Sequence, residues 1–294
     1  MTTLERNRRP LRPARVALHV FLIATALAWL APLLWTVYIS LRPYSETGVR
    51  GRAFALPEVL NFDNYVAAWQ QAELPRYYLN TFLITVPSLA LTLLGSSMVA
   101  FVIARHRPRW SKLMLIVFTA GNLLPFQILL VPLYRVYIFT ELPQWMSDSG
   151  YVYDSYWGVI AVHIAFQTGF CTFVLTNYMQ TLPHELTEAA QVDGAGVWRQ
   201  YWQLTMPLCR PVIAALATLE FTWIYNDFLW ALMLMSTGEK RPIVSALANL
   251  KGQFVADENL LAAGSLLAAL PTLIVYFALQ KQFIGGLTLG ANKG

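Results

Sequence analysis

The sequence predicts an all-α membrane protein built from six membrane-spanning helices. Two observations carry this prediction. Of the 294 residues, 56% are hydrophobic and only 13% are charged, whereas soluble domains average about 25% charged residues. Six apolar stretches are also long enough to cross a bilayer, which takes about 20 residues in a helix. The composition excludes an intrinsically disordered chain, because disorder requires few apolar residues and a high net charge.

The first apolar stretch follows a cluster of arginines, as a secretory signal does, but it is longer than the roughly 7–15 apolar residues of a signal peptide. We therefore interpret it as a retained span. No connecting loop is long enough to fold independently, so residues 1–294 are expected to form a single transmembrane domain. The expected spans are residues 17–41, 80–104, 113–139, 157–180, 212–235 and 260–280.

The distribution of lysine and arginine predicts that both termini lie in the cytoplasm. Five arginines fall within residues 6–15, and four basic residues fall within 105–112, after the second expected span. The loop after the third span, residues 140–156, holds three acidic residues and no basic one. Cytoplasmic loops carry the excess of basic residues. The net charge of +5 is therefore interpreted as a topology signal, since a nucleic-acid footprint would cluster on a folded domain.

The loop at residues 181–210, between the fourth and fifth expected spans, differs from the other cytoplasmic loops. Its charges sum to −1, whereas a loop that only lies beside anionic lipid is basic. Pro183 suits a first helical turn, and Glu185 and Glu188 suit a helix N-terminus. Asp193-Gly194 suits its end, because glycine adopts the left-handed conformation of a C-cap.

A second short helix is expected over residues 197–204, ending before Met206-Pro207. On helical physics alone two interpretations stay open. The helix pair contacts another protein, or an amphipathic helix lies on the bilayer surface, anchored by Trp198 and Trp202. The lack of a basic face counts against the second interpretation.

This loop resembles the EAA loop of ABC importer permeases, whose pattern is E-A-A, three residues, G, nine residues, I, one residue, L-P. Leu204 stands at the position of the isoleucine and Met206 at that of the leucine. Asp193 and Ala195, which flank the glycine, match the sugar-permease form. The resemblance implies that the ATPase-coupling residues are Glu188, Ala189, Ala190, Asp193, Gly194, Ala195, Leu204 and Pro207.

Other segments extend the resemblance over most of the chain. Residues 225–230, Y-N-D-F-L-W, are similar to the W-N-D-F-L-W stretch of carbohydrate permeases, with Tyr225 at the position of the tryptophan. Residues 61–65, 131–134 and 283–294 are also similar to segments of this family. The chain thus resembles the G-type membrane subunit of a carbohydrate ABC importer, with the maltose permease as the type.

The resemblance implies a type I ABC importer permease bundle with a cytoplasmic coupling helix, in a bacterial or archaeal cytoplasmic membrane. It implies a second permease subunit of the F type, two cytoplasmic ATPase subunits and an extracytoplasmic solute-binding protein as partners, beside membrane lipid. ATP and Mg²⁺ would be used by the ATPase subunits, and the sequence itself has no phosphate-binding G-x-x-x-x-G-K-[ST] motif. Catalytic residues, metal ligands and nucleic-acid binding are not expected.

Polar residues within spans usually face a bundle interior or a wet cavity, although interhelical hydrogen bonding is the more frequent role for any one of them taken singly. Glu220 and Asp227 lie seven residues apart, so a continuous helix would place them on nearly one face, directed toward the path or a partner rather than lipid. The candidates for the substrate path are Asn122, Gln127, His163, Gln167, Glu220, Trp223, Asn226 and Asp227.

The nature of the solute stays open between a sugar and a related compound such as a polyol or a glycerol phosphodiester. Arg135 is the only cation within the expected spans, and a phosphate-bearing solute would favour more of them, so a neutral sugar is preferred. A secondary transporter is disfavoured, because such proteins usually show internal repeats with broken helices.

Overall fold

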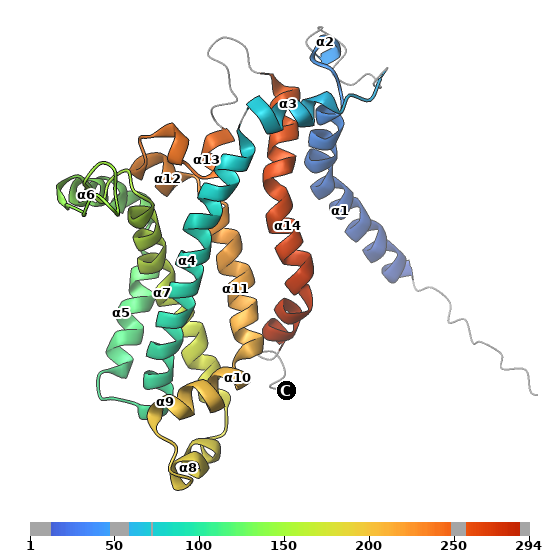
Figure 1. Ribbon diagram of the computed structural model, residues 1–294. Helices are drawn as coiled ribbons and strands as arrows, with labels where there is room; N and C mark the ends of the chain where they lie inside the picture. The colour runs from blue at the N-terminus through green and yellow to red at the C-terminus, as the bar shows by residue number, and fades with distance from the viewer. Residues whose placement is uncertain (1–12, 48–58, 72, 248–256, 289–294) are drawn as a thin grey trace, which may run out of the picture.

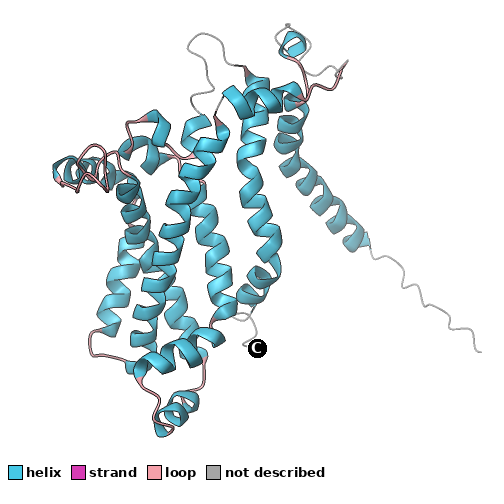
Figure 2. Ribbon diagram, in the orientation of Figure 1, coloured by secondary structure: helices cyan, strands magenta, loops and turns pink. Residues whose placement is uncertain are grey.

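A computed structural model describes residues 13–47, 59–71, 73–247 and 257–288, with side chains described up to residue 280. The arginines before residue 13 and the final residues 289–294 lie outside this range. All named elements within it are helical (Figure 2), and two residues form an isolated β-bridge, Glu141 and Tyr151. In chain order the elements are α1 (Pro13–Ser40), α2 (Tyr44–Thr47), α3 (Asp63–Gln71), α4 (Leu74–Phe101), η1 (Val102–His106), α5 (Ser111–Leu123), α6 (Phe126–Phe139), α7 (Tyr156–Thr181), α8 (Glu185–Val192), α9 (Val197–Arg199), η2 (Gln200–Thr205), α10 (Met206–Leu208), α11 (Arg210–Tyr225), α12 (Leu229–Leu234), η3 (Gly238–Lys240), α13 (Ile243–Ala246) and α14 (Glu258–Thr288).

Four helical segments in the described part of the chain are long and apolar enough to cross a bilayer by themselves: Pro13–Ser40, Leu74–His106, Tyr156–Thr181 and Glu258–Gln280. They coincide with the first, second, fourth and sixth expected spans, although the second begins six residues before the expected range and α14 continues to Thr288, eight residues past it. Two further candidates are helix pairs bent at a short break, Ser111–Leu123 with Phe126–Phe139 at 97° and Val197–Leu208 with Arg210–Tyr225 at 74°, so the total reaches six when each pair is counted as one span.

The third expected span, 113–139, is not one straight helix, and this part of the prediction is wrong. Its two halves, α5 and α6, meet at an angle of 97°. The cause is Pro125, because a proline excludes the helical conformation from the residue before it. Leu124 accordingly has ψ 128°, in the extended region. Figure 1 shows α6 running sideways from the end of α5.

The fifth expected span, 212–235, is also interrupted. Helix α11 ends at Tyr225 and α12 begins at Leu229. Between them, Asp227 accepts hydrogen bonds from the backbone N–H groups of Trp230 at 3.2 Å and Ala231 at 3.0 Å. A carboxylate that satisfies the first N–H groups of a new helix favours a fresh start over continuation of the old one. Glu220 and Asp227 therefore do not share one helix face, contrary to the prediction.

The long helices pack as a bundle in which α4 contacts α7 and α11, and α7 also contacts α5. Helix α14 lies along α11, and α1 packs against α14 at the edge (Figure 1). The short elements gather at the two ends of the bundle. Helices α3, α6, α12 and α13 lie at one end, and α8, α9 and α10 lie at the other (Figure 1).

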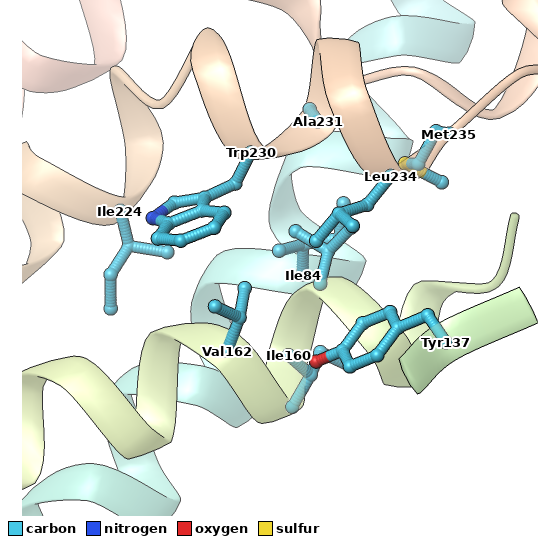
Figure 3. Packing of buried hydrophobic residues seen from close by; sticks show 10 residues of the cluster. Ile84, Tyr137, Ile160, Val162, Ile224, Trp230, Ala231, Leu234 and Met235 are labelled. Carbon is cyan, nitrogen blue, oxygen red and sulfur yellow. The ribbon is translucent and has the colours of Figure 1, made fainter. Parts of the chain in front are cut away.

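A buried apolar cluster joins α12 to the long helices near the end that carries α6. Trp230 and Leu234 of α12 pack with Ile84 of α4 and with Ile160 and Val162 of α7. Figure 3 shows these side chains directed toward one another from their separate helices. The short helix α12 is thus held by packing, although six residues are too few for a stable isolated helix.

Polar side chains join segments that lie far apart in the sequence. Asp154, at φ 60°, accepts hydrogen bonds through Oδ1 from the backbone N–H groups of Ser236 at 2.8 Å and Thr237 at 2.9 Å. The backbone N–H of Asp154 donates to the carbonyl of Leu234 at 2.9 Å. These bonds attach the segment after α12 to the start of α7.

Candidate functional site

The loop between α7 and α11 forms the first helix that the sequence predicts, as α8 (Glu185–Val192). The end of α8 has two hydrogen bonds of the Schellman type. The N–H of Ala195 donates to the carbonyl of Ala190 at 2.8 Å, and that of Gly194 donates to the carbonyl of Gln191 at 3.0 Å. Gly194 has φ +75°, which confirms the predicted left-handed conformation. The chain therefore turns sharply after α8 in a geometry that favours glycine.

The second helix of the loop is longer than the predicted range 197–204 and does not end before Met206. Helix α9, the π-helical turn η2 and α10 follow one another without a break from Val197 to Leu208. The N–H of Met206 bonds to the carbonyl of Tyr201, five residues back. This π-type bond widens the helix just before Pro207, whose ring would otherwise clash with the preceding turn.

Tyr201 anchors the loop to the bundle. Its ring is only 2% exposed, lies edge-on to Phe101 of α4 at 5.4 Å between centroids, and its hydroxyl is 2.7 Å from that of Ser97. Beside it, the buried Gln200 donates through Nε2 to the carbonyl of Ala195 at 2.7 Å. The turn after α8 is thus connected through η2 to α4.

Several predicted coupling residues converge on one hollow of about 220 Å³ between the end of α8 and η2. Ala190, Asp193, Ala195 and Leu204 line it, so residues separated by up to fourteen positions in the sequence meet in space. Glu188 and Ala189 are exposed on α8 itself. The predicted coupling residues that do not line the hollow are Glu188, Ala189, Gly194 and Pro207.

The exposed side of the loop carries large apolar side chains. Val192 is 88% exposed and Trp198 is 65% exposed, and Leu186, Val197 and Trp202 are exposed as well. A projecting surface that combines apolar side chains with acidic groups is typical of a protein–protein contact. The same tryptophans would also suit the bilayer interface, which was the alternative interpretation of this loop.

The eight candidates for the substrate path are distributed over α5, α6, α7, α11 and the segment that follows α11. Among described residues, hydrogen bonds and ion pairs join only one pair of them, His163 Nε2 and Asp227 Oδ2, at 3.7 Å. Glu220 is completely buried between α11 and α7, where its Oε1 accepts a hydrogen bond from Cys171 Sγ at 3.3 Å. Both carboxylates are therefore directed toward α7, inside the bundle.

The other candidates lie closer to the surface. Asn122 is exposed and donates to the carbonyl of Phe118 in its own helix at 2.8 Å; it faces Gly169 of α7, where an added Cβ would lie 2.4 Å from Asn122 Nδ2. The remaining four are Gln127, exposed on α6; Gln167, half-buried on α7; Trp223, exposed on α11; and Asn226, exposed at the end of α11.

Tyr201, Gln200 and Asp154 are structurally important residues that the sequence patterns do not single out. Tyr201 lies between Trp198 and Trp202, and only the two tryptophans were considered from the sequence, as anchors at the bilayer surface. The different burial of the three aromatics depends on the widened turn at η2, for which no sequence pattern provides a signal. In the sequence, Asp154 is only one of the three acidic residues that mark the loop at residues 140–156 as lying outside the cytoplasm.

Replacement of Asp227 is expected to destabilise the break between α11 and α12. Asp227→Ala removes the acceptor for two backbone N–H groups, and loss of a helix cap costs about 1 kcal/mol. Asp227→Asn keeps one acceptor oxygen and should cost less. Thermal unfolding of the purified protein measures the difference. Asn226→Ala is the matched control, because its side chain is exposed and bonds only within α11. An unchanged unfolding temperature in Asp227→Ala would contradict the capping role.

Apolar helices of membrane-crossing length, together with an anchored loop at one end of the bundle, define a multi-pass helical membrane protein. Residues 93–285 match the family described as the binding-protein-dependent transport system inner membrane component. This segment includes the last third of α4 and the whole loop between α7 and α11. The chain belongs to this family, the membrane permeases of ABC importers, and is not an enzyme.

Relatives and solved structures agree with the family. The chain is 30% identical over 277 residues to the diacetylchitobiose uptake system permease protein NgcG of Streptomyces coelicolor, covering 94% of this chain and 88% of the relative. It is 30% identical over 239 residues to the melibiose/raffinose/stachyose import permease protein MelC of Bacillus subtilis. This match covers 81% of this chain and 83% of the relative. The fold is similar, with a TM-score of 0.76 and 22% identity, to a chain of a bacterial ABC transporter that imports the polysaccharide alginate, covering 94% of this chain and 100% of that one.

Proposed function

We propose that this chain is one of two permease subunits of an ATP-driven importer for a mono- or oligosaccharide. The observation that carries the proposal is the loop between α7 and α11. Most of its EAA-type residues lie on a short capped helix or around an adjoining hollow, and the loop is anchored to the bundle by Tyr201. The carbohydrate names of the two relatives support a sugar as the solute.

In this proposal α8 inserts into a surface of a cytoplasmic ATPase subunit. When two such subunits close around ATP and Mg²⁺, α8 moves with them. The movement passes from α8 through the turn at Gly194 to η2, and from Tyr201 to Phe101 and Ser97 of α4. The permease itself binds no nucleotide. A second permease, of a different F-type chain, completes the path, and an extracytoplasmic binding protein delivers the sugar.

The chain is further proposed to form one domain with six spans and both termini in the cytoplasm. The basic segment 105–112 supports this orientation, since it lies at the same end of the bundle as α8 (Figure 1). A single cysteine at position 108 should be labelled only from the cytoplasmic side, and one at position 148 only from outside. Labelling of position 108 from outside alone would reverse the orientation.

Glu188→Lys is expected to weaken ATPase binding without preventing insertion. Glu188 is exposed in the first turns of α8, and charge reversal would set like charges together if the ATPase surface is basic there. In a contact that becomes partly buried on docking, this would cost about 2 kcal/mol, which lowers an association constant roughly thirtyfold. Co-purification of the ATPase and uptake of labelled sugars, with a labelled polyol alongside, measure docking, transport and the class of solute.

Glu141→Lys is the control, because it makes the same charge change at an exposed position in the segment between α6 and α7. It should retain both the ATPase and uptake. Full ATPase retention and uptake in Glu188→Lys would show that this residue does not contribute to docking, and uptake of the polyol alone would refute the sugar assignment.

A further inference from the structure

The connection between α4 and α5 lies at the same end of the bundle as α8 (Figure 1). A basic pocket lies beside this connection. Its volume is about 590 Å³, within the range of roughly 300–1,000 Å³ typical of ligand sites. Arg107, Arg109 and Lys112 line it together with the apolar Ile103 and Leu115, and none of its lining residues is acidic.

The three positive charges are not neutralised within the described residues. Ion pairs there involve other cations, and none joins Arg107, Arg109 or Lys112 to a carboxylate. Arg107 donates a hydrogen bond through Nη2 to Nε2 of His184 at 3.0 Å, which leaves its charge uncompensated. Three like charges around one pocket repel one another unless an anion binds between them.

Two apolar grooves open from this pocket along α5. One, of about 230 Å³, runs between α4 and α5 and meets the pocket at Ile103; its lining includes Met98, Val102, Trp110 and Met114. The other, of about 350 Å³, runs between α5 and α7, from Leu115 toward Leu123, and includes Phe173 of α7. It meets the pocket at Leu115. The lining of the first groove is entirely apolar, and that of the second is apolar except for Thr119.

We propose that the pocket and its two grooves bind one anionic diacyl phospholipid. The headgroup phosphate lies among Arg107, Arg109 and Lys112, and one acyl chain follows each groove. Arginine is well suited to phosphate, because its planar guanidinium donates two parallel hydrogen bonds. Basic pockets between membrane helices on the cytoplasmic side are typical sites for anionic lipid headgroups.

A lipid explains the combined features better than a soluble anion does. Inorganic phosphate would satisfy the three cations but would leave both grooves empty. An acidic peptide would have to enter grooves that run along membrane-crossing helices. Because Arg107 bonds to His184, the residue just before α8, the bound headgroup would also lie next to the coupling loop. The proposal rests on the proposed orientation, which places this end of the bundle on the cytoplasmic side, and it does not depend on the identity of the sugar.

Native mass spectrometry of the purified permease complex with added lipid tests the site. Phosphatidylglycerol should be retained in preference to phosphatidylcholine. Removing one cation by Arg109→Gln should weaken phosphatidylglycerol binding about fivefold, and Arg109→Gln with Lys112→Gln roughly 25-fold, since each basic residue contributes about a fivefold factor. Arg135→Gln, which removes an exposed cation on α6 outside the pocket, should leave lipid retention unchanged.

A groove-filling variant separates a lipid from a free anion. Val102→Trp occupies the groove between α4 and α5 while all three cations remain, and it should lower phosphatidylglycerol retention severalfold. Met114→Trp fills the same groove from α5. It replaces Val102→Trp in this test if that variant fails to assemble. If the groove-filling variants retained as much phosphatidylglycerol as the unmodified protein, and inorganic phosphate displaced that lipid completely, the site would be an anion pocket. That result would refute the lipid assignment. Equal retention of the two lipids by the unmodified protein would also overturn it.

Discussion

Gly194→Val should sharply reduce transport while the permease remains inserted in the membrane. Gly194 has φ +75°, where an L-residue is disfavoured by about 1–2 kcal/mol and a β-branched residue by more. The site itself is open, because an added Cβ would meet nothing within 4 Å. The expected effect is therefore backbone strain, which breaks the two hydrogen bonds that end α8 and changes the direction in which α8 projects. Sugar uptake and ATPase co-purification should both fall, each by about tenfold or more.

Gly196→Val is the matched control for this prediction. Gly196 lies two residues further along the same loop, also with nothing within 4 Å of an added Cβ. Its backbone, at φ −66° and ψ 165°, is in the extended region, which valine adopts readily. Near-normal uptake in Gly196→Val, with loss in Gly194→Val, would identify the left-handed turn as the cause. Equal loss in both would indicate that the loop simply does not tolerate a larger side chain.

Tyr201→Ala is expected to uncouple ATP hydrolysis from transport. Truncation of a buried aromatic side chain costs roughly 3–5 kcal/mol, and Tyr201 links the loop to both Ser97 and Phe101 of α4. Helix α8 keeps its own surface and should still bind the ATPase, but its movement would no longer be transmitted to α4. Uptake should fall at least tenfold while the ATPase continues to co-purify.

Two neighbouring variants define what Tyr201 contributes. Tyr201→Phe keeps the ring and loses only the hydroxyl contact with Ser97, a cost of about 1 kcal/mol, so most of the uptake should remain. Trp202→Ala removes an adjacent aromatic that is 50% exposed and should retain coupling. Normal uptake in Tyr201→Ala would show that the movement reaches the bundle through other contacts.

Much of the loop between α7 and α11 is predictable from local sequence. The first helix, its acidic first turns and the turn at Gly194 depend on neighbouring residues, and the structure has each of them. Helix starts and ends of this kind involve hydrogen bonds within a few residues, so their signals lie within a short stretch of sequence. The hollow that Leu204 shares with Ala190 follows only when η2 folds back against the end of α8.

The interruptions of the third and fifth spans were not predicted, for two different physical reasons. Pro125 is a visible helix breaker, but the apolar run continues through it, and hydropathy alone does not distinguish a bent pair from a straight span. Asp227 lies in an equally apolar stretch. Its action as a cap depends on α12 packing against Ile84 and Val162, and those contacts come from distant parts of the chain.

Composition and local spacing are enough to assign the class of this protein, because apolar composition requires a bilayer and the spacing of the EAA-type loop encodes a local structure. Which polar side chains meet depends instead on how the helices pack. This packing buries Glu220 against Cys171, places His163 beside Asp227, and leaves Asn122 and Trp223 at the surface. The physical reason is that helical periodicity specifies which residues share a face, whereas the neighbour of that face is determined by the packing of helices far apart in the chain.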